Sequence, residues 1–189
     1  HGGLARLVAG SVTEKVLRQA PCPVLTVPLG QGAVPPGPGP FKSILCAVDF
    51  SQASLHAVEY ALSLAQEAAA RLVVAHVIDW PNTAGLSAPL AAAIDDSRRD
   101  YEARRLAELR AAVPASARAW CQIEEVLAVG TPGQQIVHLA NAQAIDLIVM
   151  GVHGKSALNL AMFGSTTRQV VHDAHCPVLT VPAACRTSD

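Results

Sequence analysis

The sequence predicts an α/β protein with a doubly wound, open sheet of five parallel strands in the Rossmann-like order 3-2-1-4-5. Two observations support this fold class. Short apolar, β-branched runs such as RLVVAHVI at 71–78 and LIVM at 147–150 are typical of buried parallel strands. Segments with helical periodicity separate these runs, and one strand leads directly into a glycine turn. Alternation of this kind gives a parallel sheet with helices on both faces.

The composition is that of a globular protein. Of the 189 residues, 51% are hydrophobic and 15% are charged, which is too apolar for an intrinsically disordered chain. A formal net charge of -1 provides no basic field for nucleic acid and no polybasic patch for a membrane. No apolar run is long enough to span a bilayer, and the N-terminus has no secretory signal pattern. We therefore expect a cytoplasmic protein without nucleic-acid or membrane partners.

The first strand of the complete domain is expected at Phe41–Val48, which is a nearly continuous apolar run. It ends at Asp49, and Ser51 is a favourable N-cap for a helix. That helix should turn one apolar face toward the sheet. The face comprises Leu55, Val58, Leu62 and Ala65.

The other elements are expected to alternate in the same way, with an irregular stretch from Asp79 to Pro89. They are the strand 71–78, the helix 95–113, a strand from near 121 to 129, a helix from the capping-box sequence 131–134, the strand 147–150, a helix from 164–165 and the strand 178–181. The arginine-rich side of the helix 95–113 is most simply a solvated face.

A repeat indicates two homologous domains. The segment from Gly10 to Pro28 matches the segment from Gly164 to Pro182 at a constant offset of 154 residues, which is about one domain length. The stretch GQGAVPPGPGP at 30–40 is too rich in proline and glycine for a helix or strand. We therefore divide the chain into 1–29, expected to be the end of an N-terminally truncated first domain, 30–40, a linker, and 41–189, a complete domain.

The five cysteines are an odd number and include no C-x-x-C pair, so they are expected to be reduced thiols. Cys46 lies in an apolar strand, and Cys22 and Cys176 each precede PVLTV. Burial as small hydrophobic side chains is the simplest account of these cysteines. Cys185, near the polar C-terminus, is the one that we expect to be reactive.

The glycines after the fourth strand are typical of a phosphate loop. Gly151 and Gly154 are followed, nine residues later, by Gly164-Ser165 at a helix start. Glycine lets backbone N–H groups approach a phosphate, and a helix N-terminus favours an anion. The spacing is not GxGxxG, and Val149 stands where a Walker A loop needs glycine. The glycines could instead only end a strand and start a helix, but the complete spacing favours the nucleotide loop.

Asp49 should lie opposite this loop. Strands one and four are neighbours where the strand order reverses, and open α/β sheets bind ligands at such points. A carboxylate there suits the hydroxyl or amine donors of a sugar or base, while the loop N–H groups suit phosphates. Asp49 could alternatively be a helix-start acid that stabilises the dipole of the next helix. His76 is expected to be a core or strand-end histidine.

The spacing G-x2-G-x9-G-[S/T] met by Gly151, Gly154, Gly164 and Ser165 resembles the nucleotide motif of the universal stress protein family. Residues 41–182 look like a whole domain of its nucleotide-binding branch, and 1–28 like the end of another. The resemblance implies that ATP lies along the crevice, with or without a bound Mg²⁺ ion. The implied contact residues are Val48, Asp49, Val77, Gly151, His153, Gly154, Gly164, Ser165 and Thr166.

The implied roles differ along the crevice. Asp49 would meet the nucleoside, and the backbones of Val77 and Val48 would meet the adenine. The glycines, His153, Ser165 and Thr166 would surround the phosphates, although His153 could equally be a solvent-exposed loop residue. The family often has valine where this chain has Thr166, a change that a backbone contact would survive.

In this family the fifth strand is an edge that pairs with the same strand of a neighbour. The resemblance therefore implies a homodimer, or a pseudo-dimer in which Val24–Val27 pairs with Val178–Val181 and covers that edge.

Three functions remain open from the sequence. The first is an ATP-binding regulatory module in a stress response, with slow or no hydrolysis because no positioned base, metal carboxylate pair or arginine finger is visible. The second is an enzyme, namely a weak ATPase or autophosphorylating protein, a nucleotidyl transferase or an ATP pyrophosphatase. The H-x-G-H and S-G-G-x-D-S signatures of the last two are absent from AVDFSQAS. The third is an interaction protein that works through dimerisation and holds no nucleotide. The glycine pattern favours the first.

Overall fold

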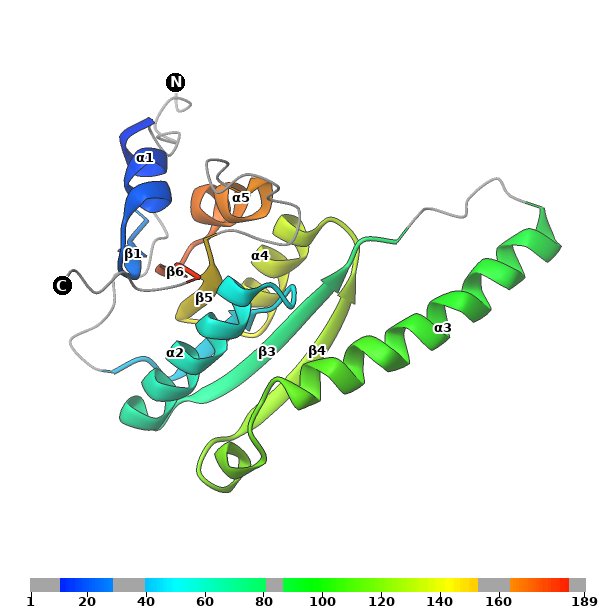
Figure 1. Cartoon of the computed structure of the whole chain (residues 1–189), viewed down its shortest axis with the longest axis horizontal. Helices are drawn as coiled ribbons and strands as arrows, with labels where there is room; N and C mark the ends of the chain where they lie inside the picture. The colour runs from blue at the N-terminus through cyan, green and yellow to red at the C-terminus, as the bar shows by residue number, and fades with distance from the viewer. Residues whose placement is uncertain (1–10, 29–39, 81–86, 153–163, 184–189) are drawn as a thin grey trace.

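A computed structural model describes residues 11–28, 40–80, 87–152 and 164–183. Its centre is a single sheet of six strands in the order β1-β6-β5-β2-β3-β4 (Figure 1). All neighbouring strands are parallel except β1 and β6, which are antiparallel. The strands are β1 (Val24–Thr26), β2 (Ser43–Ala47), β3 (Arg71–Ile78), β4 (Ile123–Val129), β5 (Leu147–Gly151) and β6 (Val178–Val181).

The predicted fold class is confirmed. The five strands of the complete domain, β2 to β6, are parallel and follow the expected order 3-2-1-4-5. The sixth strand, β1, comes from the first repeat and extends the sheet at its β6 edge. The expected pairing of these two segments is present over Val24–Thr26 and residues 178–180, with Leu25 opposite Leu179, and does not extend to Val27 and Val181. An edge that would otherwise expose unpaired backbone groups is therefore covered within the chain.

Helices cover both faces of the sheet because β2, β3 and β5 are apolar on both sides. One face packs Ile44 and Leu72 against α2 (Gln52–Ala68) and α3 (Ala88–Ala111). The other face packs Leu45 and Ile148 against α4 (Pro132–Ala142) and α5 (Ser165–Asp173). The remaining helices are α1 (Ser11–Gln19) and the 3₁₀ turn η1 (Ala115–Ala119). The carboxyl ends of the parallel strands are left at one edge, between these layers.

Helix α2 begins as predicted. The Ser51 side chain accepts a hydrogen bond from the Ser54 N–H at 3.2 Å, which satisfies one of the free donors of the first turn. The prediction for Leu55 was wrong, since this residue is 41% exposed. The buried face is made largely by small residues, including Ala57, Ala61 and Ala65. Alanine gives no strong apolar periodicity, so the larger Leu55 was assigned to the wrong side.

Two other helix starts differ from the predictions. Helix α3 begins at Ala88, seven residues before the expected Asp95, because the alanine-rich first turns favour a helix without an apolar stripe. Its first turns extend well beyond the sheet (Figure 1). Helix α4 starts with Pro132, as expected, but the Thr131 side chain makes no capping hydrogen bond, so the predicted capping box is not formed.

No helix within the described residues is both long and apolar enough to cross a membrane.

Burial separates the cysteines into two classes. Burial raises the pKa of the Cys46 thiol to about 12, and burial together with the nearby Asp146 raises the pKa of the Cys176 thiol to about 11. Cys121 is also buried, with a pKa raised chiefly by desolvation. The prediction of burial was wrong for Cys22, which is exposed. Cys185 lies outside the described residues.

We expect Cys22 to be alkylated in the native protein while Cys46 and Cys176 are not. At pH 8.5 the two buried groups remain protonated because their pKa values lie well above that pH, and the thiolate is the nucleophile. Mass spectrometry after iodoacetamide treatment of a Cys185→Ser variant measures the labelled positions. Native labelling of Cys46 as fast as that of Cys22 would contradict the described packing.

Candidate functional site

A cavity of about 250 Å³ opens at the carboxyl ends of β2, β3 and β5, between the sheet and helices α4 and α5. This is just below the range of roughly 300–1,000 Å³ usual for small-molecule sites. Seven of the nine predicted contact residues line it. They are Val48, Asp49, Val77, Gly151, Gly164, Ser165 and Thr166. The other two, His153 and Gly154, lie outside the described residues.

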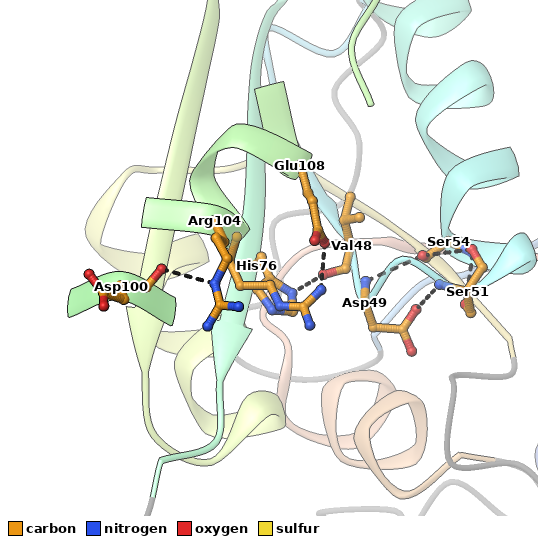
Figure 2. Close-up of polar contacts among 9 residues, drawn as sticks. Val48, Asp49, Ser51, Ser54, His76, Asp100, Arg104 and Glu108 are labelled. Carbon is orange, nitrogen blue, oxygen red and sulfur yellow. Dashed lines mark hydrogen bonds and ion pairs between the residues drawn. The ribbon is translucent and has the colours of Figure 1, made fainter. Parts of the chain in front are cut away.

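The turn from β2 into α2 holds Asp49 at the cavity wall (Figure 2). One oxygen of its carboxylate accepts the Ser51 N–H at 3.0 Å, and the Asp49 N–H donates to the Ser54 hydroxyl at 3.3 Å. Phe50 between them has φ 62°, a left-handed conformation that is uncommon for an aromatic residue. Asp49 is therefore a helix-start acid, as the alternative interpretation stated. Asp49 also lines the cavity, so the same carboxylate that accepts the Ser51 N–H is placed at the cavity wall.

His76 lies beside the end of β2 and is buried, as predicted for a core histidine. Its Nδ1 lies 2.7 Å from the Val48 carbonyl oxygen, so this nitrogen carries the proton and donates (Figure 2). The Val48 N–H donates to the Ala75 carbonyl at 2.8 Å. The Phe50 ring packs over His76, with ring centroids 4.7 Å apart. The backbone of Val48 is thus committed to internal bonds, and its contribution to a ligand would come mainly from its side chain.

Val77 is placed differently, because β3 runs past the end of β2. The pairing of β2 with β3 ends at Ala47 and Ala75, and the pairing of β3 with β4 continues to Ile78. The Ala75 carbonyl points toward β2, and the Ile78 carbonyl points toward β4, where it accepts the Gly130 N–H. Backbone groups alternate in direction along a strand, so the N–H and C=O of Val77 point to the β2 side, beyond that strand's last paired residue. They form a donor and acceptor pair at the cavity.

The two described motif glycines differ in how closely the protein packs around them. A Cβ on Gly151 would lie 2.8 Å from the Ser54 nitrogen and 2.9 Å from the Ala53 Cβ, so glycine here allows β5 to contact the start of α2. Among the described residues, the nearest atoms to a Cβ on Gly164 would be the Thr167 hydroxyl and the Val152 carbonyl oxygen, both at 3.6 Å. The fold therefore demands glycine at Gly151, while Gly164 has room for a side chain or for a ligand.

The N-terminus of α5 forms the polar end of the cavity. Gly164 is the N-cap residue and has no side chain to cap the helix, and a helix N-terminus of this kind favours an anion. Ser165 is exposed and Thr166 half-buried. The Thr167 hydroxyl lies 3.2 Å from the Gly151 carbonyl and 3.3 Å from the Val152 carbonyl, and this fixes the helix start to the end of β5.

The sequence did not indicate the apolar walls. They come from strand residues adjacent to predicted ones and from the first turns of α4. The missed lining residues are Ala47, Ser54, Ala75, Pro132, Ile136, Met150 and Thr167. Strand alternation could have indicated Ala75, which lies on the same face of β3 as Val77.

The described wall of the cavity is mostly apolar. Asp49 is the only ionisable residue among the described residues that line the cavity. Within the described ranges, no three His, Cys, Asp or Glu side chains are grouped as the ligands of a metal ion. The arrangement offers an apolar slot, one carboxylate, a backbone donor and acceptor pair, and a helix N-terminus.

Comparison with known sequences gives the family of this chain. The profile described as "Universal stress protein family" matches residues 1–28 and 40–182, which is most of the sequence. The chain belongs to the universal stress protein family. A universal stress protein of Methanocaldococcus jannaschii, MJ0531, is 32% identical over 142 residues, covering 75% of this chain and 82% of that protein. The resemblance inferred from the glycine spacing is thereby confirmed at the level of the family.

Two further relatives bear on the organisation and the ligand. The Mycobacterium tuberculosis universal stress protein Rv2005c is 27% identical to this chain over 180 residues. The alignment covers 95% of this chain and 58% of Rv2005c. A solved structure described as a universal stress protein in complex with cAMP is 28% identical, with a TM-score of 0.53. The alignment covers 77% of this chain and all of that one.

Proposed function

We propose that this universal stress protein binds ATP in the cavity and acts as a regulatory module in a stress response. The observation that carries the proposal is the set of groups around one cavity: the backbone edge of Val77, which lies beyond the last β2 residue paired with β3 among the described strands, the carboxylate of Asp49 and the N-terminus of α5. In that order they suit a base, a sugar and phosphates. A related structure described as a complex with cAMP, which is also an adenine nucleotide, supports the choice of ligand.

The adenine would lie against the apolar walls at Val77, Pro132 and Ile136. Adenine has a ring-nitrogen acceptor beside its amino donor, and the N–H and C=O of one residue can satisfy both. Removing the Val77 N–H and C=O from water costs little free energy only when both are hydrogen-bonded. The Val77 backbone therefore favours a planar ligand that offers an acceptor beside a donor.

The phosphates would be held by the N–H groups at the start of α5 and by the hydroxyls of Ser165 and Thr166. Mg²⁺ that accompanies ATP would be carried by the phosphates. Rapid hydrolysis needs positive charge or a positioned base at the transferred group, and no lysine, arginine or histidine is among the described lining residues. We infer that turnover is slow, at about 10⁻³ s⁻¹ or below, as for nucleotide hydrolysis without such groups.

Asp49 provides a test with a built-in control. Asp49→Asn keeps an oxygen that accepts the Ser51 N–H but removes the charge that would bind ribose hydroxyls. We expect the affinity for ATP to fall about tenfold, because a hydrogen bond to a charged group contributes about 1.5–3 kcal/mol, while the melting temperature is nearly unchanged. Asp49→Ala should lower both.

Isothermal titration calorimetry and thermal denaturation measure the two effects. Unchanged ATP affinity in Asp49→Asn, with lost stability in Asp49→Ala, would restrict Asp49 to its role at the helix start. Absence of ATP binding by the wild-type protein would favour the alternative function, a stress protein that acts through protein contacts without a nucleotide.

We also propose that α1 and β1 are the end of a first universal stress domain. The constant offset between 10–28 and 164–182 supports this, as does the family match to residues 1–28. The match to Rv2005c over nearly the whole chain is consistent with two copies in tandem.

A further inference from the structure

The contact between the two repeats has the symmetry of a dimer. Val24 pairs with Thr180, Leu25 with Leu179 and Thr26 with Val178. Under the offset of 154 residues, Leu25 is the equivalent of Leu179, and Val24 and Thr26 are the equivalents of Val178 and Thr180. Each equivalent position therefore makes the reciprocal contact. A local two-fold axis passes between Leu25 and Leu179, as in an isologous interface.

One ion pair lies across the same axis. Glu14 on α1 accepts from the Arg168 Nε on α5 at 2.8 Å. Residue 168 is also the equivalent of residue 14 under the offset of 154. The same position of the repeat thus contacts itself across the axis, with an acid in the first copy and a base in the second.

Helix α1 has one buried side, and it is the side that carries Glu14. Leu17, one turn after Glu14 on the same side of the helix, is 2% exposed. Val16 is 49% exposed, whereas its equivalent in the second copy, Val170, is completely buried in the core beneath α5. Among the described residues, α1 therefore buries the side that faces the complete domain. The Thr180 hydroxyl, which donates to the Val24 carbonyl at 3.3 Å, adds a polar contact.

Because position 14 of the first copy meets position 168 of the second, the charges at these two equivalent residues affect which elements can pair. If two complete domains paired through β6, the same symmetry would place Arg168 against Arg168. Two first copies would place Glu14 against Glu14. Like charges in contact disfavour a complex, and opposite charges favour it. The ion pair is partly exposed, so its effect is one of selection among similar interfaces.

We propose that position 14/168 selects the partner of the β6 edge. The surface formed by β6 and α5 takes an α1–β1 element with an acid at this position, and rejects a second copy of itself. This applies to elements of the same chain and to those of another chain. The inference is independent of nucleotide binding, since none of these residues is assigned to the nucleotide.

Charge reversal tests the rule within the full chain. Glu14→Arg and Arg168→Glu each create a like-charged pair, and the double variant restores an opposite pair with exchanged charges. We expect amide hydrogen exchange of residues 24–26 to be about two- to tenfold faster in each single variant, and to return toward the wild-type rate in the double variant. The amides of β2 provide an internal reference for global stability. Lys15→Glu, an exposed charge reversal on the same helix, is the matched control and should leave the rates nearly unchanged.

Mixing the two single variants gives a second test. In each variant alone, residues 14 and 168 carry charges of the same sign, so like charges meet in both the intrachain and the interchain pairing, and sedimentation velocity should show only weak homodimerisation. In an equimolar mixture, the Arg168 side chain of the Glu14→Arg variant can meet the carboxylate that the Arg168→Glu variant carries at the same position. Heterodimers should then form at concentrations about two- to tenfold below those of either homodimer. Additive effects in the exchange cycle, or homodimers as strong as the heterodimer, would overturn the proposal. So would a mixture without any heterodimer.

Discussion

Replacement of Gly151 by serine is expected to lower the free energy of unfolding by about 1–3 kcal/mol, because the new Cβ has no space. It would lie within 3.0 Å of the Ser54 nitrogen and of two Ala53 atoms, at the first turn of α2. These neighbours are a backbone and a Cβ, which no rotamer change can move. The strain would separate β5 from α2 at the centre of the sheet.

The same change at Gly164 is the control. A Cβ there has its nearest neighbours at 3.6 Å, the backbone has φ -61°, and serine is a favoured N-cap residue. We expect Gly164→Ser to change stability by less than about 0.5 kcal/mol. Urea unfolding of both variants measures the difference. Equal destabilisation at the two positions would contradict the described packing of Gly151.

Replacement of Ser165 by aspartate is expected to change stability and ATP affinity in opposite directions. Ser165 is the first residue of α5 and is exposed, so a carboxylate there interacts favourably with the helix dipole and adds about 0.3–1 kcal/mol of stability. The same charge repels phosphates that approach the helix N-terminus. We expect at least a tenfold loss of affinity for ATP, or about 1.4 kcal/mol.

Titration with adenosine distinguishes the nucleoside end of the proposed site from its phosphate end. Adenosine lacks phosphates, so its weaker binding should be nearly unaffected by Ser165→Asp, and Ser165→Ala should behave almost like the wild type with both ligands. Calorimetric titrations with ATP and adenosine, together with melting temperatures, measure these effects. Equal loss of adenosine and ATP affinity in Ser165→Asp would mean that the phosphates do not lie at the start of α5.

The central strands could be predicted because their sequences allow one interpretation. Arg71–Ile78 and Val178–Val181 have the expected boundaries, since buried parallel strands are short apolar runs that end at polar or turn residues. The pairing of β1 with β6 could be predicted from the repeat combined with the family resemblance, which implies an edge pairing between last strands. The start of α3 could not, because an alanine-rich segment forms a helix without the apolar stripe that marks one. For the same reason Leu55 was assigned to the buried face of α2, whereas Ala57 and Ala61 were not.

The polar residues at the site could be located from motifs, but their separate tasks depend on three-dimensional contacts. The glycine spacing identified Gly151 and Gly164 together, although only the first is crowded by α2. Nothing in the sequence near Val77 shows that β3 extends beyond the last residue of β2 with which it pairs. This extension is what leaves the Val77 backbone without a β2 partner. Pro132 and Ile136 reach the cavity because α4 packs over the sheet, a contact between distant parts of the chain.

The proposed function depends on an adenine nucleotide in the cavity at the ends of β2, β3 and β5. To test this, the purified wild-type protein is denatured with acid and the released compounds are identified by ion-pair chromatography, with ATP titration of any protein that is purified empty. We predict released adenine nucleotide, or saturable binding of one ATP per chain. A protein that releases no nucleotide and gives no heat with ATP would contradict the proposed function.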